Sequence, residues 1–454
     1  MGFDKGCMKS LMPEKVFSIC VLLVITLNMI FIGGKRRNFG LFVSAFYRSF
    51  NGTSLFELNM VGDSYSSLAF ILMPFLTSGI AYWNSAYQLA MFIAGIFIFC
   101  SSMLTSIVTS AWMLFLTHTL LHGIGSGIVL ASCTLVVADY FNKKHPYHVL
   151  ATSLASSGAY GVLILTPLFA HLIQAYGWRT AFQIIGILFV IVIGLAVIFY
   201  VPEENPYTEI GEKSQIDQTK WKFTTWNHVM ENKQTLFWFV DRALNGAIFF
   251  ALLMNLTEYR RQSGIVDMEI ESGSTINIML GIGECFTFTV TMIIGDHIRG
   301  RLVVVQLIGA CFSFLSTILM RAVTHSIVAT NVITVMLGGS VGMANCVLYA
   351  SSSEAMNIDG SISLPMSKMM SAFGALLSPF FSGLIIDGYG FEGLFVSLIL
   401  LTFLRIVCLS TINFILYQKR KLTKEMESYN EMEANETTSL NEFNPNPNVS
   451  HSNI

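Results

Sequence analysis

The chain has 454 residues, of which 53% are hydrophobic and 12% are charged. A soluble domain carries roughly 25% charged residues, so this composition argues against a soluble globular protein and against a disordered one. A formal net charge of −2 gives no attraction to an anionic polymer, which argues against a nucleic-acid binder as well. What remains is an integral membrane protein with an apolar surface toward lipid.

Apolar stretches long enough to cross a bilayer recur along the whole chain. A membrane helix needs about 20 apolar residues, whereas a transmembrane β-barrel alternates over segments of about ten. The expected spans are 16–33, 59–80, 89–109, 114–137, 147–175, 181–201, 237–254, 273–294, 302–320, 327–350, 364–386 and 394–417. The sequence therefore predicts an all-α membrane protein with twelve transmembrane helices.

A polar stretch near the middle divides these spans into two groups of six. It contains Glu203, Glu204, Asn205 and Pro206 and is the longest hydrophilic interruption before the tail. The expected organisation has five parts. They are an N-terminal tail (1–15), a six-helix half (16–201), a linker (202–233), a second six-helix half (234–417) and a disordered tail (418–454) rich in Asn, Glu and Ser.

The distribution of Lys and Arg predicts the orientation in the membrane. Cations near helix ends mark the cytoplasmic side. Under a twelve-span register the N-terminal Lys residues, Lys143, Lys144, the linker Lys residues and the start of the tail fall on one side, while Arg321 falls on the other. We therefore expect both termini and the linker in the cytoplasm. The plasma membrane is the default location because no organelle address is evident.

A short motif is repeated in the two halves. Residues 167–182 read PLFAHLIQAYGWRTAF and residues 379–395 read PFFSGLIIDGYGFEGLF, and both copies contain Pro, then Leu-Ile, then Tyr-Gly-aromatic, then Phe. Parallel repeats related by an axis along the membrane normal are a transporter architecture. The repeat favours a duplicated bundle.

The most specific segment of the chain is 139–182. It resembles the monocarboxylate transporter family of the major facilitator superfamily, in an aromatic-Phe-x-Lys-Lys loop, a small-residue helix and a Gly-Trp-Arg-x-x-Phe turn. The matching residues are Tyr140, Phe141, Lys143, Lys144, Ala151, Ala155, Ser157, Gly158, Gly161, Gly177, Trp178, Arg179 and Phe182. The small residues predict that helix 5 closely approaches a neighbouring helix.

The resemblance also implies site residues on helix 8. Proton-coupled lactate carriers of the family have an Asp and an Arg one turn apart there. In this chain Glu284 stands for the acid, and Phe288 stands where the Arg would be. Phe288 supplies no positive charge; it is expected either to line a substrate cavity or, as is commoner for an aromatic residue in a helical bundle, to contact lipid or the core.

Three consecutive cations, Lys35, Arg36 and Arg37, follow the first predicted span. In the family a Lys near this position attracts carboxylate, and Arg37 is the best positional match. A guanidinium fork suits a planar carboxylate through two parallel hydrogen bonds. The alternative is that the cations mark an interfacial helix end. Asp241 and Arg242, early in helix 7, have two similar interpretations: one side chain faces the cavity, or both form ion pairs with other helices.

Two groups are candidates for carrying protons. Glu284 lies deep in an apolar span, where an ionisable residue is usually retained for function. His118 and His122 are spaced i, i+4 on helix 4 and could relay protons or pack in the core. No third ligand accompanies the histidines, and the eight cysteines contain no CxxC pair, so we expect no metal and no cofactor.

The loops predict a gate. Asp296 and Arg299 match a superfamily loop whose ion pairs hold one face closed. From the resemblance, Lys143, Lys144 and the turn Gly177-Trp178-Arg179 are expected to be gating or structural elements.

The resulting hypothesis is a transporter of small organic acids that works by alternating access and is not an enzyme. Coupling to protons and the need for a single-span accessory subunit are left open. One alternative is a facilitative carrier of an aromatic amino acid or another neutral metabolite. The other is a transporter-derived sensor that no longer moves solute. No paired catalytic carboxylates point to an enzyme.

Overall fold

A computed structural model of the chain describes residues 13–50, 52–83, 85–201, 232–262, 270–323 and 326–443, and this described part contains helices and no strand. Ten of its helical segments are long and apolar enough to cross a membrane. Two of them, α8 (Tyr160–Phe199) and α16 (Gly360–Phe443), are each divided by a glycine with non-helical geometry. The described residues therefore contain the twelve spans that the sequence predicts.

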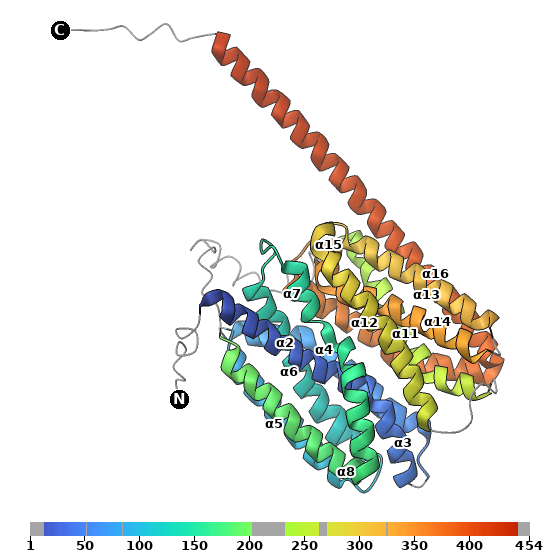
Figure 1. The fold of residues 1–454 in the computed structure, drawn as a ribbon. Coiled ribbons are helices and arrows are strands. Elements are labelled where there is room, and N and C mark those ends of the chain that lie inside the picture. The colour runs from blue at the N-terminus through green and yellow to red at the C-terminus, as the bar shows by residue number, and fades with distance from the viewer. Residues whose placement is uncertain are drawn as a thin grey trace.

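The helices form two bundles that lie side by side (Figure 1). We call residues 13–201 the N-terminal half and residues 232–420 the C-terminal half. Besides α8, the N-terminal half contains α2 (Glu14–Arg37), α3 (Phe39–Ser49), α4 (Leu55–Tyr82), α5 (Tyr87–Ile107), the π-helix η1 (Phe115–Leu120), α6 (Leu121–Tyr140), α7 (His148–Leu154) and η2 (Ser157–Ala159). Besides α16, the C-terminal half contains α11 (Lys233–Gln262), α12 (Ile270–Gly295), η3 (Asp296–Ile298), α13 (Leu302–Ala322), α14 (Ile327–Cys346) and α15 (Leu348–Met356). The predicted linker falls almost wholly on 202–231, outside the described residues.

The glycines that divide α8 and α16 occupy the same place in the two copies of the repeated motif. Gly177 has φ 76° and Gly390 has φ 65°, a left-handed conformation that glycine adopts without steric cost. The aromatic residue after each one packs against the first crossing of its own half, which is α2 with α3 in the N-terminal half and α11 in the C-terminal half. Trp178 donates a hydrogen bond to Ser49 Oγ of α3 at 2.9 Å, and the ring of Phe391 lies 5.4 Å from that of Tyr259 of α11. The repeat is thus a structural one, because each turn fastens a hairpin to the first crossing of its half.

The first crossing is longer than the sequence predicts. The predicted span ends at Gly33, but α2 continues to Arg37 and, after a bend at Asn38, the chain continues as α3 to Ser49. The side chain of Asn38 stabilises the bend, because its Nδ2 donates to the Gly34 carbonyl at 3.0 Å and its Oδ1 accepts from Thr166 at 2.5 Å. The three cations therefore lie inside the bundle instead of marking an interfacial helix end.

Small residues let α2 and the start of α8 touch at their backbones, as predicted for helix 5. A Cβ atom built on Gly33 would lie 2.4 Å from Gly158 Cα, and one built on Gly161 would lie 2.2 Å from the Ile30 carbonyl oxygen. No side chain fits at such distances. This contact fixes the height and rotation of α2 immediately before Arg36 and Arg37.

The predicted disorder of 418–454 is wrong for its first part, because α16 remains helical to Phe443 and projects from the bundle (Figure 1). The preceding membrane span supplies the helical nucleus, so the tail has only to propagate it. Lys421 and Glu425 also face each other one turn apart at 3.8 Å. Residues 444–454 lie outside the described part.

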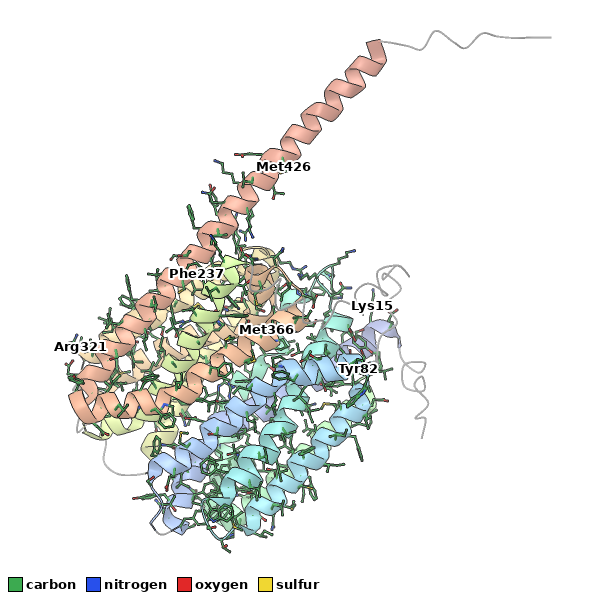
Figure 2. The ribbon with its side chains drawn as sticks, turned by 180° about the vertical axis from the view of Figure 1, so that it is seen from behind. Lys15, Tyr82, Phe237, Arg321, Met366 and Met426 are labelled. Carbon is green, nitrogen blue, oxygen red and sulfur yellow. The ribbon has the colours of Figure 1, made fainter. Side chains whose placement is uncertain are left out.

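Both described chain ends lie at one side of the bundle. Figure 2 shows Lys15, Tyr82 and Met426 toward one end of the helices and Arg321 at the other. We call the first end the terminal side. Between the two ends the outer surface carries large exposed apolar side chains, such as Phe75, Phe286 and Phe414. These exposed side chains are what a surface in contact with lipid requires.

Candidate functional site

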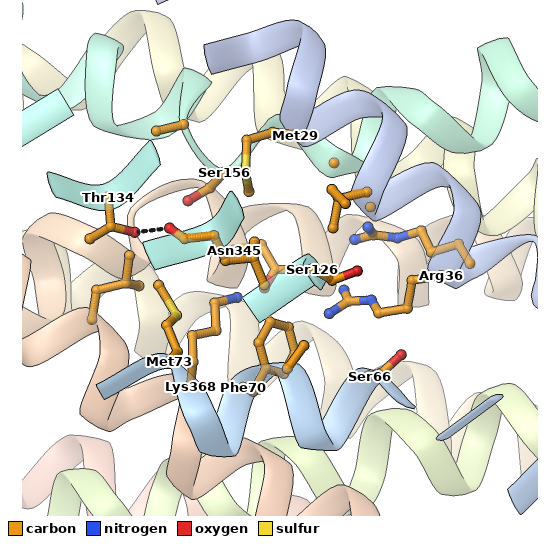
Figure 3. A pocket seen from close by; sticks show the side chains of 18 of the residues that line it. Met29, Arg36, Ser66, Phe70, Met73, Ser126, Thr134, Ser156, Asn345 and Lys368 are labelled. Atoms are coloured by element: carbon orange, nitrogen blue, oxygen red, sulfur yellow. Dashed lines mark hydrogen bonds between the residues drawn. The ribbon is translucent and has the colours of Figure 1, made fainter. Parts of the chain in front are cut away.

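A cavity lies between the two halves, with an empty volume of about 680 Å³ counted out to its open mouth (Figure 3). The N-terminal half lines it with α2, α4, α6 and the start of the α7–α8 segment, and the C-terminal half with Asn345 of α14 and Leu364 and Lys368 of α16. Its three charged lining residues are the cations Arg36, Arg37 and Lys368; no Asp or Glu of the described chain lines it. The lining of the cavity is thus positively charged.

Arg37 and Glu284 form an ion pair that joins the two halves. The Arg37 Nη2 group donates to Glu284 Oε1, and Asn345 Nδ2 donates to the same oxygen at 3.2 Å. Both side chains are buried, and Arg37 Nε and Glu284 Oε2 have no hydrogen-bond partner among the described residues. A buried pair with incomplete hydrogen bonding is poorly stabilised, so it can exchange partners when substrate, water or a proton arrives.

Arg36 and Lys368 face the same aromatic ring from opposite halves. The Arg36 guanidinium carbon lies 5.0 Å from the ring centroid of Phe70, and Lys368 Nζ lies 5.2 Å from it. Figure 3 shows Phe70 between Arg36 and Lys368. Cation–π contact stabilises each cation partially, but it does not neutralise their charge.

Lys35 does not face the cavity. It is fully buried within the N-terminal half, where its Nζ lies 3.3 Å from His122 Nδ1 and over the rings of Phe182 and Phe189. Successive helical residues point about 100° apart, so three consecutive cations cannot share one face. The predicted substrate contact by Lys35 is therefore not supported.

The histidines also belong to the interior of the N-terminal half. His122 and His118 stack at a centroid distance of 5.1 Å, with His118 in the π-helix η1. The contacts of His122 are with Lys35, His118 and nearby aromatic rings, whereas Glu284 contacts Arg37 and Asn345. The two residues predicted for proton coupling are not brought together.

Three further residues predicted to bind substrate lie away from the cavity. Phe288 is fully buried and packs edge-on against Tyr160, with ring centroids 5.6 Å apart, because this turn of α12 faces α8. Asp241 and Arg242 pair with each other, because the long Arg242 side chain folds back to its neighbour. Arg405 Nε donates to Asp241 at 3.0 Å and Arg242 donates to Gln306 at 3.1 Å, so this network ties α11 to α13 and α16 within the C-terminal half.

Asp296 and Arg299 close the terminal side. The Asp296 carboxylate accepts the backbone N–H groups of Val149 and Leu150 at 2.9 and 3.1 Å, and Arg299 donates to the His145 carbonyl at 2.8 Å. One turn deeper, Ser153 Oγ donates to the Cys346 carbonyl at 2.9 Å. All of these bonds join one half to the other, which is the arrangement a gate requires.

The remaining motif residues have structural surroundings. Lys143 and Lys144 are exposed in the loop before α7. Arg179 stacks on Trp178 at 4.3 Å and donates to the carbonyls of Ser106 and Val108, at the C-terminal end of α5. Gly177, Trp178 and Arg179 thus hold the turn between two helices, at the end of the bundle opposite the terminal side.

Sequence reasoning missed Lys368 and Asn345. Lys368 carried a usable signal, because it is an ionisable residue inside the predicted span 364–386, and such residues are expensive in a membrane unless they have a role. Asn345 is a polar residue in a span rich in Gly and Ser, where no pattern separates packing from function.

Comparison with known proteins gives local and global likenesses. The chain is 32% identical over 100 residues to monocarboxylate transporter 12 of Xenopus laevis, which covers 22% of this chain and 21% of the relative. It is 33% identical over 97 residues to monocarboxylate transporter 3 of Gallus gallus, covering 21% of this chain and 17% of the relative. The chain thus spans about a fifth of the length of the curated relatives it matches.

The fold is similar to that of a solved transporter. The crystal structure of the human organic anion transporter MFSD10 (TETRAN) superposes with a TM-score of 0.66 at 13% sequence identity, covering 88% of this chain and 100% of that one. At this identity the likeness shows the fold alone. The family model of the Major Facilitator Superfamily matches residues 19–363, which is most of the chain. Twelve membrane spans, a cavity between two bundles and this match together show that the chain belongs to the Major Facilitator Superfamily of membrane transporters.

Proposed function

We propose that this protein carries small organic anions across the membrane by alternating access. The observation that carries the proposal is the charge of the cavity, which three cations line and to which Glu284 contributes one negative charge through Arg37. Buried cations with too few counter-charges attract an anion, and a guanidinium or ammonium group binds carboxylate well. The sequence likeness to monocarboxylate transporters supports the same class of substrate.

The Arg37–Glu284 pair gives this proposal a mechanism. An incoming carboxylate competes with Glu284 for Arg37, and a displaced Glu284 in an apolar surrounding favours its protonated form. Substrate and proton would then occupy the cavity together and leave it together. Since the pair joins α2 to α12, its rearrangement also changes how strongly the halves hold each other at mid-height.

The gate supplies the other half of an alternating cycle. The bonds of Asp296, Arg299 and Ser153 hold the halves together at the terminal side and lie on a different level from the cavity. Rocking one half against the other around the cavity would break them and open that side.

We propose that the protein lies in the plasma membrane and that its terminal side faces the cytoplasm. The exposed Lys143 and Lys144 lie in the loop that packs on η3, and Lys419 and Lys421 lie where α16 leaves the bundle. Such cations at helix ends favour the cytoplasmic leaflet. A protease-cleavable tag at residue 454 tests this orientation: it should be protected in intact cells and cut after permeabilisation.

Uptake into proteoliposomes tests the function. Purified protein is reconstituted and offered labelled carboxylates, amino acids and uncharged metabolites, with and without an inward proton gradient. We expect saturable uptake of a carboxylate that exceeds protein-free vesicles, with accumulation raised by the gradient. Uptake of a neutral metabolite and of no carboxylate would contradict the proposal, and so would binding of ligand without any accumulation.

A further inference from the structure

The two cations that lack a carboxylate partner face each other across the cavity. Arg37 pairs with Glu284, but no described carboxylate pairs with Arg36 or with Lys368. Arg36 comes from α2 and Lys368 from α16, and both lie against the ring of Phe70. Because both distances are measured to one centroid, the guanidinium carbon and the ammonium nitrogen are at most about 10 Å apart.

The charge of the surroundings does not balance these cations. Arg36, Arg37, Arg242 and Glu284 are charged groups that act on Lys368. Glu284 is bonded to Arg37, and Arg242 is bonded to Asp241. Two positive charges are therefore left without a described counter-charge, and like charges in a site shielded from water repel each other strongly.

The wall between the cations is apolar. Phe70 lies between them, and Met73 and Leu364 also line the cavity. The polar lining groups include Ser66 and Ser126. A matching ligand would have a negative group at each end and a short apolar centre that contacts the ring.

We propose that the preferred substrate is a short-chain dicarboxylate, bound with one carboxylate at Arg36 and the other at Lys368 and with its carbon chain over Phe70. This inference rests on the proposed function and adds the substrate class. A monocarboxylate neutralises only one of the two cations, whereas a dicarboxylate neutralises both. Because Arg36 and Lys368 belong to different halves, the substrate itself would join the halves when it binds.

The test compares ligands of equal length that differ by one charge. Proteoliposomes containing the full chain are offered labelled succinate, glutarate and adipate, each beside the monocarboxylate of the same carbon number. We expect the best dicarboxylate to exceed its partner at least about tenfold in uptake at low concentration, since a desolvated charge pair contributes that much or more.

Substitutions at Lys368 and Arg36 test whether these two cations cause the preference for dicarboxylates. Lys368→Met should lower dicarboxylate uptake at least about tenfold and monocarboxylate uptake by a clearly smaller factor, so that the preference for the dicarboxylate is lost, and Arg36→Gln should act in the same way. Lys368→Arg keeps the charge and should keep the preference, which controls for folding. Lys419→Met makes the same substitution outside the cavity, where Nζ bonds to Gln234, and should change neither uptake.

The outcomes separate this inference from the proposed function. Preference for a monocarboxylate in the wild type, with equal loss for both classes in Lys368→Met, would overturn the dicarboxylate assignment and keep organic-anion transport. Uptake of neutral solutes alone would overturn both. A dicarboxylate preference that disappears in Lys368→Met and persists in Lys368→Arg supports both.

Discussion

The two halves of the transporter bury positive charge in opposite ways. In the C-terminal half, Arg242 and Arg405 share the carboxylate of Asp241, so the ion pairs of this network lie within one half. In the N-terminal half, Arg36 and Arg37 point into the cavity, and the one carboxylate that reaches them, Glu284, comes from the other half. The first arrangement holds helices together in every state, and the second can change with the state of the transporter.

This difference explains why similar residue pairs have different roles. The Asp241 network is buried and does not line the cavity between the halves, so its removal leaves no charge that substrate in the cavity can reach. The Arg37–Glu284 pair sits beside the cavity, so its removal leaves a charge that water or substrate can reach. Matching substitutions in the two pairs should therefore have different effects.

The largest effect is expected from Asp241→Asn. It leaves two buried guanidinium groups without a counter-charge, which costs about 3–5 kcal/mol of stability. Thermal unfolding of the detergent-solubilised protein should show a large loss, or the protein should fail to accumulate. Glu392→Gln removes an exposed partner of Arg321 and should leave the unfolding temperature nearly unchanged. Equal stability of the two variants would contradict the structural role of Asp241.

Glu284→Gln should preserve folding and change transport. The amide can still accept a bond from Arg37, which borders the cavity, but it cannot take up a proton. Gradient-driven accumulation of the carboxylate should be lost while counterflow of substrate continues, measured in the same proteoliposomes. Unchanged accumulation in this variant would remove Glu284 from the coupling mechanism.

Gly161→Ala tests the contact that positions the cations. The added Cβ would meet the Ile30 carbonyl, and overpacking of this kind costs about 1–3 kcal/mol. We expect reduced uptake and a modest loss of thermal stability, because α2 must move. Gly40→Ala, for which a Cβ meets nothing within 4 Å, is the matched control. A Gly161→Ala protein that transports like the control would show that transport does not require the close contact between α2 and α8.

The smallest effect concerns pH at the gate. Partial burial and then Arg299 lower the pKa of His145 below its ordinary value of 6.5, and its Nδ1 accepts the Tyr147 N–H at 3.2 Å. The closed gate thus favours neutral His145. The stabilisation of the closed state by His145 is complete above the ordinary pKa of 6.5 and is lost as the pH falls through the lowered pKa. Acidification should slightly open the terminal side.

Labelling of Cys346, which lies beside Ser153 behind the gate, measures this opening when the other cysteines are replaced. The rate with a membrane-impermeant thiol reagent is compared at neutral and acidic pH between the parent and His145→Gln. The Gln variant has no titrating group at this position and corrects for the pH dependence of the thiol itself. The same pH dependence in both proteins would exclude His145 from the gate.

The sequence was informative where a single physical pattern decides the structure. Long apolar runs predicted the twelve spans, and the Tyr-Gly-aromatic repeat, which predicted a duplicated bundle, contains the glycines of both turns. Arg37 and Glu284 were both predicted as site residues, because a charge buried in a membrane is usually kept for function. Their pairing with each other was not predicted.

Other predictions depend on helix rotation and packing, which no pattern in the sequence decides. Hydropathy could not tell that Lys35 turns toward His122 while Arg36 faces the cavity, since adjacent residues differ only in direction. Phe288 was placed by analogy with an Arg, but an apolar ring on the same turn packs against Tyr160 instead. Lys368 was overlooked because its span looked less uniform, although one cation inside a membrane helix was itself the signal.

Binding of one ligand in charged and uncharged form tests the central claim most directly. Purified wild-type protein is titrated by calorimetry with a short carboxylate that it carries and with the corresponding amide. Because the cavity supplies cations that lack counter-charges, the carboxylate should bind at least about tenfold more tightly than the amide. Equal affinity for the two ligands would contradict an anion-binding passage between the halves.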